Sequence, residues 1–131
     1  MPEPPTHAFR LGTDLVAVAR IADLASRHAD RFRERVFTRA ELAYADANPK
    51  RTDEHLAARF AAKEAARKAL GTGLTRGSHW TDIEGTRHAS GQPELVLHNR
   101  AHAVADELGI TGTALSLSHT AEYASATVIA W

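Results

Sequence analysis

One segment decides much of the fold: Arg59-Phe60-Ala61-Ala62-Lys63-Glu64-Ala65-Ala66-Arg67-Lys68-Ala69. Its composition predicts a helix, and at about 100° per residue the alanines from Ala57 to Ala69 cover nearly half of the cylinder. A face of bare methyl groups lets another backbone approach closely. We expect the helix to run over His55–Leu70, with Asp53 as its cap and Gly71 as its stop.

Charged residues border this alanine face. Glu64 and Lys68 are four residues apart and are therefore neighbours on the helix surface. Arg59, Lys63 and Arg67 form a second row, also at a spacing of four, on the charged side. On spacing alone, Glu64 and Lys68 form a surface ion pair that contributes about 0.2–0.5 kcal/mol.

The rest of the chain alternates between strand and helix patterns. The pattern predicts five strands, at Phe9–Leu15, Trp80–Arg87, Glu94–His98, Thr113–His119 and Tyr123–Trp131. It also predicts three further helices. They run over Ala17–His28, from the Thr38/Glu41 capping box to Asn48-Pro49, and over Arg100–Leu108 after an Asn99 cap. This order predicts an α+β fold in which helices pack on one antiparallel sheet. We expect residues 1–7 to be a Pro-rich flexible tail and residues 8–131 to be one domain.

Composition excludes several classes of protein. The 131 residues have a formal net charge of zero, so the molecule as a whole has no reason to bind nucleic acid. The chain contains no cysteine, which excludes disulfides and cysteine–zinc sites and fits a cytoplasmic protein. No apolar run approaches the roughly 18 residues of a membrane-spanning helix, and the first residues do not resemble a signal peptide. We therefore expect a cytoplasmic protein with no membrane partner.

Asp14 stands out because it interrupts an otherwise apolar strand. A carboxylate beside Gly12, among Leu15 and Val16, needs a partner or a metal. Two carboxylates on rigid elements, Asp14 and Glu64, suit Mg²⁺, which takes oxygen ligands and binds substrate phosphates. The alternative is that Asp14 only caps or pairs locally.

The segment Ser116-Leu117-Ser118-His119-Thr120 ends one strand of the terminal hairpin. Serine with histidine can form a nucleophile and its base, but no oxyanion hole or nucleophile elbow accompanies them. We therefore interpret His119 as a donor to a phosphate at the strand end.

Basic residues are concentrated between residues 20 and 39. The arginines are Arg20, Arg27, Arg31, Arg33, Arg35 and Arg39, against the acids Asp23, Asp30 and Glu34. This segment is either a solvated helical face or a docking surface for an acidic partner.

Together these segments resemble holo-[acyl-carrier-protein] synthase, the small, single-copy type of 4′-phosphopantetheinyl transferase. Four motifs carry the resemblance in order: Gly12-Thr13-Asp14 with Arg20, Arg59–Leu70 with Gly71-Thr72-Gly73, Trp80–Glu84 with Gly91-Gln92-Pro93, and Ser116–Thr120. The match extends from about Phe9 to Trp131. The Pro-rich start and the many histidines depart from the family pattern and leave the physiological carrier open.

The resemblance implies a reaction and a set of residues. The enzyme would transfer 4′-phosphopantetheine from coenzyme A to a serine of an apo acyl carrier protein, in fatty acid or polyketide biosynthesis, and release adenosine 3′,5′-bisphosphate. Asp14 and Glu64 would bind Mg²⁺, and Lys68 would join them as the third catalytic residue. Arg20 and Arg27 would bind the carrier. The coenzyme A contacts would be Arg59, Lys63, Lys68, Gly71, Pro93, His119 and Thr120.

The family also implies a homotrimer with coenzyme A bound at subunit boundaries, because this chain holds one copy of a fold that larger relatives contain twice. The alanine face and the apolar hairpin strands leave room for such an interface. Two other functions remain open on the residues alone. One is a binding module for coenzyme A or a carrier protein without turnover. The other is a different magnesium-dependent nucleotide enzyme, which the absence of Walker A and G-x-G-x-x-G patterns disfavours.

Overall fold

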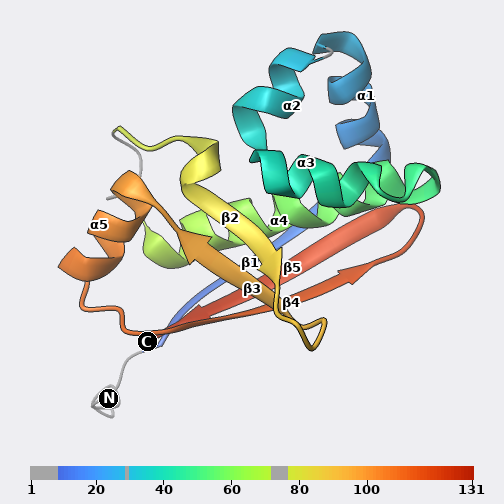
Figure 1. Ribbon diagram of the computed structural model, residues 1–131. Coiled ribbons are helices and arrows are strands. Elements are labelled where there is room, and N and C mark those ends of the chain that lie inside the picture. The colour runs from blue at the N-terminus through green and yellow to red at the C-terminus, as the bar shows by residue number, and fades with distance from the viewer. Residues whose placement is uncertain (1–8, 29, 72–76) are drawn as a thin grey trace.

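The computed structural model describes residues 9–28, 30–71 and 77–131 (Figure 1). The tail expected over residues 1–7 lies outside the described residues, as do Thr72 and Gly73 of the glycine motif. In chain order, the elements are β1 (Arg10–Ala17), α1 (Val18–His28), α2 (Asp30–Val36), α3 (Arg39–Asp46), the 3₁₀ turn η1 (Pro49–Arg51), α4 (Thr52–Leu70), the 3₁₀ turn η3 (Trp80–Asp82), β2 (Ile83–Arg87), β3 (Pro93–Leu97), α5 (Asn99–Glu107), β4 (Thr113–His119) and β5 (Tyr123–Ala130).

The strands form two antiparallel sheets rather than one. The first sheet has the order β1-β5-β4, and the second pairs β2 with β3. The α+β class is confirmed, but the prediction of a single sheet was wrong. The two sheets approach at β3 and β4, where a cavity of about 270 Å³, lined in part by Pro93, Leu95 and Thr113, lies between the strands in place of a hydrogen-bonded ladder.

The first sheet packs on α4 through the close approach of two backbones. A Cβ atom added at Gly12 of β1 would lie 1.8 Å from the carbonyl oxygen of Ala65 and 2.9 Å from the amide nitrogen of Ala69. No side chain larger than hydrogen fits there, so a glycine on the strand meets alanines on the helix. The prediction that the alanine face admits a neighbouring backbone is confirmed.

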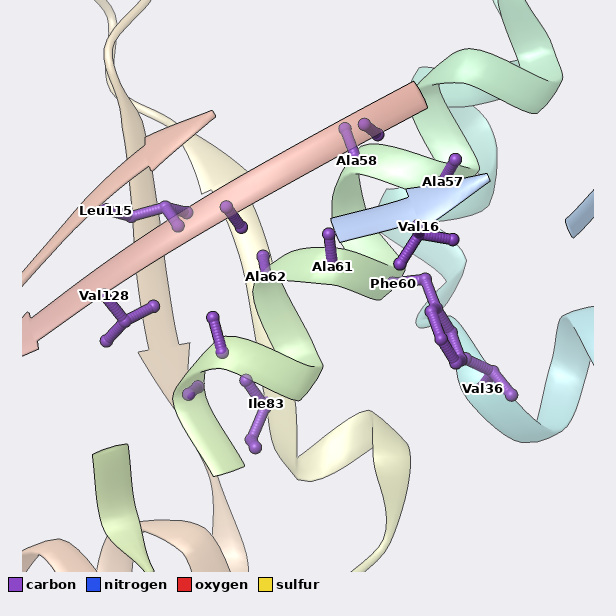
Figure 2. Packing of buried hydrophobic residues seen from close by; sticks show 14 of the residues in the cluster. Val16, Val36, Ala57, Ala58, Phe60, Ala61, Ala62, Ile83, Leu115 and Val128 are labelled. Atoms are coloured by element: carbon purple, nitrogen blue, oxygen red, sulfur yellow. The ribbon is translucent and has the colours of Figure 1, made fainter. Parts of the chain in front are cut away.

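Alternation along β1 and β5 then determines which side chains enter the core. Residues 12, 14 and 16 of β1 face α4, and the even-numbered residues of β5 from Ala124 to Ala130 are buried beside them. Figure 2 shows Val16 of β1 beside Ala61 and Phe60 of α4, within the cluster that also contains Val128 of β5. Asp14 is thus held on the inner face of the sheet between Gly12 and Val16.

Four local predictions need correction. Three helices were expected between the first and second strands, but there are four, because residues 30–36 form α2. Helix α4 begins at Thr52, one residue before the proposed cap Asp53, and Arg51 at its N-cap makes no side-chain cap hydrogen bond. Residues 80–82 form a 3₁₀ turn instead of strand. Asn99 is inside α5, where its φ is +49°, and His98 occupies the cap position.

The capping box at the start of α3 is confirmed. The Thr38 hydroxyl accepts a hydrogen bond from the Glu41 amide, and the Glu41 carboxylate accepts one from the Thr38 amide. Together these bonds satisfy two backbone donors that the helix itself cannot pair. They also fix Glu41 inside the core, where it is only 1% exposed.

Replacing Gly12 with alanine tests the close packing. Overpacking of a core typically costs about 1–3 kcal/mol. We expect Gly12→Ala to lower the free energy of unfolding by at least the upper end of that range, because the added methyl group meets helix backbone that cannot rotate away. The matched control is Gly109→Ala, where a Cβ meets nothing within 4 Å and only the positive φ is strained. Urea denaturation measures both, and equal losses would contradict the close packing.

Candidate active site

Lys68 joins β1 to α4 at the edge of the core. Its Nζ donates to the carbonyl oxygen of Thr13 at 2.8 Å and lies 3.2 Å from Oδ1 of Asp14. The Lys68 side chain is 55% exposed and that of Asp14 only 17%, so the pair opens to solvent from the lysine side. The structure therefore brings together two of the three predicted catalytic residues, which are 54 positions apart in the chain.

Glu64, the third predicted catalytic residue, lies one helical turn before Lys68 on α4. It is half-buried, and it makes no hydrogen bond or ion pair among the residues that the structure describes. The ion pair with Lys68 that the helical spacing allowed is not formed, because Lys68 turns to Asp14 instead. Glu64 thus keeps its carboxylate oxygens unpaired within the described residues, one helical turn from Lys68.

The donor chemistry of Asp14 and Glu64 fits Mg²⁺. Magnesium in substrate sites is commonly held by one or two carboxylates and completes its octahedron with water and phosphate oxygens. Within the described ranges, no group of three or more His, Cys, Asp or Glu side chains could hold a metal alone. An ion at Asp14 and Glu64 would therefore depend on other oxygen ligands, which a substrate phosphate supplies.

Lys63 has a structural environment that does not fit the predicted phosphate contact. Its ammonium group is fully buried and donates to Glu41 Oε1 at 2.7 Å, to the carbonyl of Trp80 at 3.2 Å and to the carbonyl of Ile83. Burial lowers the pKa of Lys63, and the Glu41 carboxylate opposes that shift. The second oxygen of Glu41 accepts from the amide of Gly85, so the ion pair links α3, α4 and β2.

Arg59 is also covered, at 2% exposure. Its guanidinium carbon lies 4.1 Å from the ring centroid of Tyr44, and Arg87 approaches the same ring at 5.3 Å. The row of basic residues on α4 was expected on a charged face, yet α3 and β2 bury Arg59 and Lys63. Arg67 extends from the covered region, with its guanidinium 4.7 Å from the Trp80 ring.

His119 ends β4 on the inner face of the sheet, at the opposite end of α4 from Lys68. Its Nδ1 lies 3.3 Å from Oε1 of Glu54, in the first turn of α4, and its ring meets His55 edge-on. Glu54 and Lys68 are separated by about 21 Å of helix at 1.5 Å per residue. Within one chain, His119 is therefore remote from the Asp14–Lys68 pair.

The other three predicted coenzyme A contacts occupy turns and strand ends. Gly71 ends α4 with a φ of +77°, and its amide donates to the carbonyl of Arg67. Pro93 begins β3 at the margin of the cavity between the sheets. The Thr120 hydroxyl accepts from the amides of Glu122 and Tyr123 in the hairpin turn. All three are positioned by backbone geometry rather than by side-chain contacts to the Asp14–Lys68 pair.

Arg20 and Arg27 lie exposed on α1, directly after β1. The Arg20 guanidinium carbon is 5.7 Å from the centroid of the Phe60 ring on α4. Arg27 donates from Nε to Asp23 one turn earlier, at 3.1 Å. The helix therefore presents basic side chains to solvent near the strand that carries Asp14.

Known proteins resemble this chain in sequence and in fold. The model of the family described as "4′-phosphopantetheinyl transferase superfamily" matches residues 10–128. The chain belongs to this family. It is 48% identical, over 118 residues, to a holo-[acyl-carrier-protein] synthase of Koribacter versatilis, covering 90% of this chain and 94% of that protein. The resemblance predicted from the four motifs is confirmed.

Solved structures of this family share the fold. The holo-[acyl-carrier-protein] synthase of Neisseria meningitidis superposes with a TM-score of 0.82 at 35% identity, covering 93% of this chain and 97% of that one. The Helicobacter pylori synthase in complex with coenzyme A superposes with a TM-score of 0.79 at 29% identity, covering 92% and 99%. Among the described residues of this chain, no helix combines the length and apolarity needed to cross a bilayer.

Sequence reasoning missed the partners of the site residues. Glu54, Tyr44 and the buried role of Glu41 were not singled out, because each partner comes from another element. Only the Thr38/Glu41 capping box gave a signal, since it fixed the side chain of Glu41 near the helix start.

The Glu41–Lys63 pair generates a prediction about stability. We expect Lys63→Met to lower the free energy of unfolding by about 3–5 kcal/mol, because it leaves the Glu41 carboxylate buried without its cation. Lys50→Met, on the exposed turn η1, is the control and should change stability by less than about 0.5 kcal/mol. Chemical denaturation compares the two variants. A small loss for Lys63→Met would contradict the stabilising role of the Glu41–Lys63 pair.

Proposed function

We propose that this chain is a holo-[acyl-carrier-protein] synthase that transfers 4′-phosphopantetheine from coenzyme A to a serine of an apo acyl carrier protein. The observation that carries the proposal is the contact between Lys68 and Asp14, with Glu64 one turn away, in a chain that matches the transferase family over residues 10–128. The synthases of similar sequence, and the Helicobacter pylori complex with coenzyme A, support the same substrates. These substrates suit a cytoplasmic enzyme of fatty acid or polyketide biosynthesis.

In the proposed reaction, the serine hydroxyl of the carrier attacks the β-phosphorus of coenzyme A. The new bond joins the serine oxygen to phosphorus, and the bond from phosphorus to the leaving adenosine 3′,5′-bisphosphate breaks. The serine proton leaves to a nearby base. Such a step needs positioning and charge neutralisation more than covalent chemistry.

The residues divide this work. Lys68 is half-exposed beside Asp14, so its ammonium group is placed to neutralise phosphate charge on the leaving group. Asp14 and Glu64 would hold Mg²⁺, which supplies charge stabilisation for the phosphates. Lys63 is excluded from the coenzyme A contacts because Glu41 and two carbonyls occupy its ammonium group. Arg59 contributes a stacked, covered charge rather than a free side chain.

The two ends of α4 give a physical reason for a homotrimer. His119 and Thr120 lie near the start of α4, whereas Asp14, Glu64 and Lys68 lie near its end. One coenzyme A molecule can meet both groups if the His119 end of one subunit lies beside the Asp14 end of its neighbour. Pro93 and Gly71 would border the nucleotide in this arrangement.

The outer face of the three-stranded sheet is the proposed contact surface. Among the described residues, the positions that alternation places on this face carry no formal charge, and several are large apolar side chains. Leu11 is 62% exposed and Leu15 is 67% exposed, with Ile129 opposite Leu11 in the register. Exposed apolar surface of this kind marks interaction sites. The alanine face of α4 cannot serve, because β1 and β5 of the same chain cover it.

The carrier is proposed to dock on α1. Acyl carrier proteins are acidic helical bundles, and Arg20 and Arg27 are exposed on the helix that follows the Asp14 strand. The Asp23 pairing of Arg27 also fits a solvated helix face, so kinetics must separate the two interpretations.

The metal site is tested by neutralising each carboxylate. Asp14→Asn and Glu64→Gln should each lower turnover about a hundredfold or more at limiting Mg²⁺, without loss of folding, because each removes an anionic ligand. Asp106→Asn on α5 is the matched control and should retain turnover. Mass spectrometry of an apo carrier, incubated with coenzyme A and Mg²⁺, measures the gain of phosphopantetheine. Full activity in either site variant would refute the metal assignment.

The assembly is tested on the outer face of the sheet. Leu11→Asp combined with Leu15→Asp should convert a trimer to monomers, because two charges cannot be buried in an apolar interface. Val96→Asp, an exposed apolar residue of β3, is the control and should leave the trimer intact. Sedimentation velocity gives the masses. A wild-type chain that is monomeric and active would contradict the assembly.

The docking surface is tested by charge reversal. Arg20→Glu with Arg27→Glu should raise KM for the carrier and flatten its dependence on salt, while affinity for coenzyme A stays nearly constant, because rim charges mainly set the encounter rate. Arg100→Glu on α5 controls for charge reversal elsewhere. Steady-state kinetics at two ionic strengths decides, and unchanged carrier kinetics in the double variant would identify α1 as a solvated face only.

A further inference from the structure

Glu54 forms the contact that determines what His119 can do. A carboxylate only accepts hydrogen bonds, so a hydrogen bond across the 3.3 Å between Nδ1 of His119 and Oε1 of Glu54 requires a proton on Nδ1. A neutral imidazole has one N–H group, and here that group is directed at Glu54. The Nε2 of a neutral His119 is therefore an acceptor and cannot donate to a phosphate.

His119 can donate to an anion from Nε2 only when both ring nitrogens are protonated. The negative charge of Glu54 stabilises that imidazolium, and a phosphate on the other side stabilises it further. The two side chains are about three-quarters buried, with exposures of 25% for His119 and 21% for Glu54, so water weakens their interaction less than it would at an open surface. Anion binding at Nε2 of His119 thus requires the imidazolium form of the ring.

His55 is the other group near this site that can change charge at neutral pH. Its ring packs against Tyr44, with centroids 5.1 Å apart, and meets His119 edge-on at 6.0 Å. Its Nδ1 is buried and has no hydrogen-bond partner in the described part of the chain. Burial lowers the pKa of His55; Arg59, His119 and Arg87 lower it further, and only Glu54 opposes them.

The charged and titratable groups near the two histidines favour a proton on His119 over one on His55. Glu54 and His55 of α4 contact His119 directly. Arg59 of α4, Tyr44 of α3 and Arg87 of β2 act on or contact His55 instead. Arg59 and Arg87 disfavour a positive charge on His55. The buried Nδ1 of His55 also has no hydrogen-bond acceptor in the described part of the chain. His119 has an acceptor for its Nδ1–H group in Glu54, and its Nε2 has no partner among the residues that the structure describes.

We propose that Glu54 is a positioning residue that directs Nδ1–H of His119 toward itself, so that His119 takes a proton from solvent onto Nε2 as coenzyme A binds and donates it in a hydrogen bond to a phosphate. This assignment rests on the proposed function, since it takes coenzyme A as the ligand. Its consequence is that coenzyme A binds more weakly at a pH where His119 has lost its second ring proton.

Calorimetry with coenzyme A and no carrier protein tests the assignment. Titrations in HEPES and in Tris, whose ionisation enthalpies differ, count the protons taken up. The wild-type protein should take up protons at about pH 7.5, and the pH dependence should follow one group. Glu54→Gln keeps an acceptor but loses the charge, so binding should weaken about tenfold at about pH 7.5 and stay within about threefold of wild type at about pH 6. His55→Phe keeps an aromatic ring and should retain the proton uptake.

Nitrogen NMR of the His119 ring gives a readout that a purely structural role would not change. In the free wild-type protein at high pH, Nδ1 should be protonated, and Nε2 should gain a proton on addition of coenzyme A. Three results would each overturn the proposal. The first is an Nε2–H tautomer in the free protein, and the second is a Glu54→Gln variant with the wild-type pH dependence. The third is loss of proton uptake in His55→Phe. Circular dichroism excludes unfolded variants, and the wild-type NMR result decides if neither variant folds. Intact proton uptake without transfer to a carrier would refute the proposed function alone.

Discussion

The backbone of β1 at Gly12 lies directly against the backbone of α4 at Ala65 and Ala69, with no side chain between them. This spacing requires glycine on the strand and alanine on the helix. Because side chains alternate along a strand, it also fixes Asp14, two residues later, on the face that meets the helix. Lys68 then reaches both Asp14 and the carbonyl of Thr13 from one turn beyond Glu64. The proposed chemistry therefore depends on how closely two backbones approach.

A second constraint holds the remaining elements on the other side of α4. The buried Glu41–Lys63 pair joins α3 to α4, and Glu41 also accepts from Gly85 of β2. These bonds satisfy a buried carboxylate and ammonium whose isolation would be costly. Helix α4 is thus fixed on one side by alanine packing and on the other by an ion pair, and its two ends carry separate halves of the proposed site.

The sequence supported the fold class, the central helix and the family because those signals are local. Alanine spacing, the capping box at Thr38 and the four motifs each occupy a short stretch. The division into two sheets could not be predicted from the sequence, since it depends on how β3 meets β4 across the cavity. The burial of Lys63 was not predicted for a similar reason. Its spacing resembles that of an exposed basic row, and only the position of Glu41 on another helix shows that it is buried. Glu54 was overlooked because it lies 65 positions from His119.

In the proposed trimer, the Asp14 end of one subunit and the His119 end of its neighbour form one site. The most direct measurement mixes two impaired chains, Asp14→Asn and His119→Ala, refolds them together and assays transfer at limiting coenzyme A. Random mixing should give about one quarter of the wild-type rate, because one interface in four receives both intact halves. If the mixed sample is no more active than the separate variants, both halves belong to one chain, and the claim is wrong.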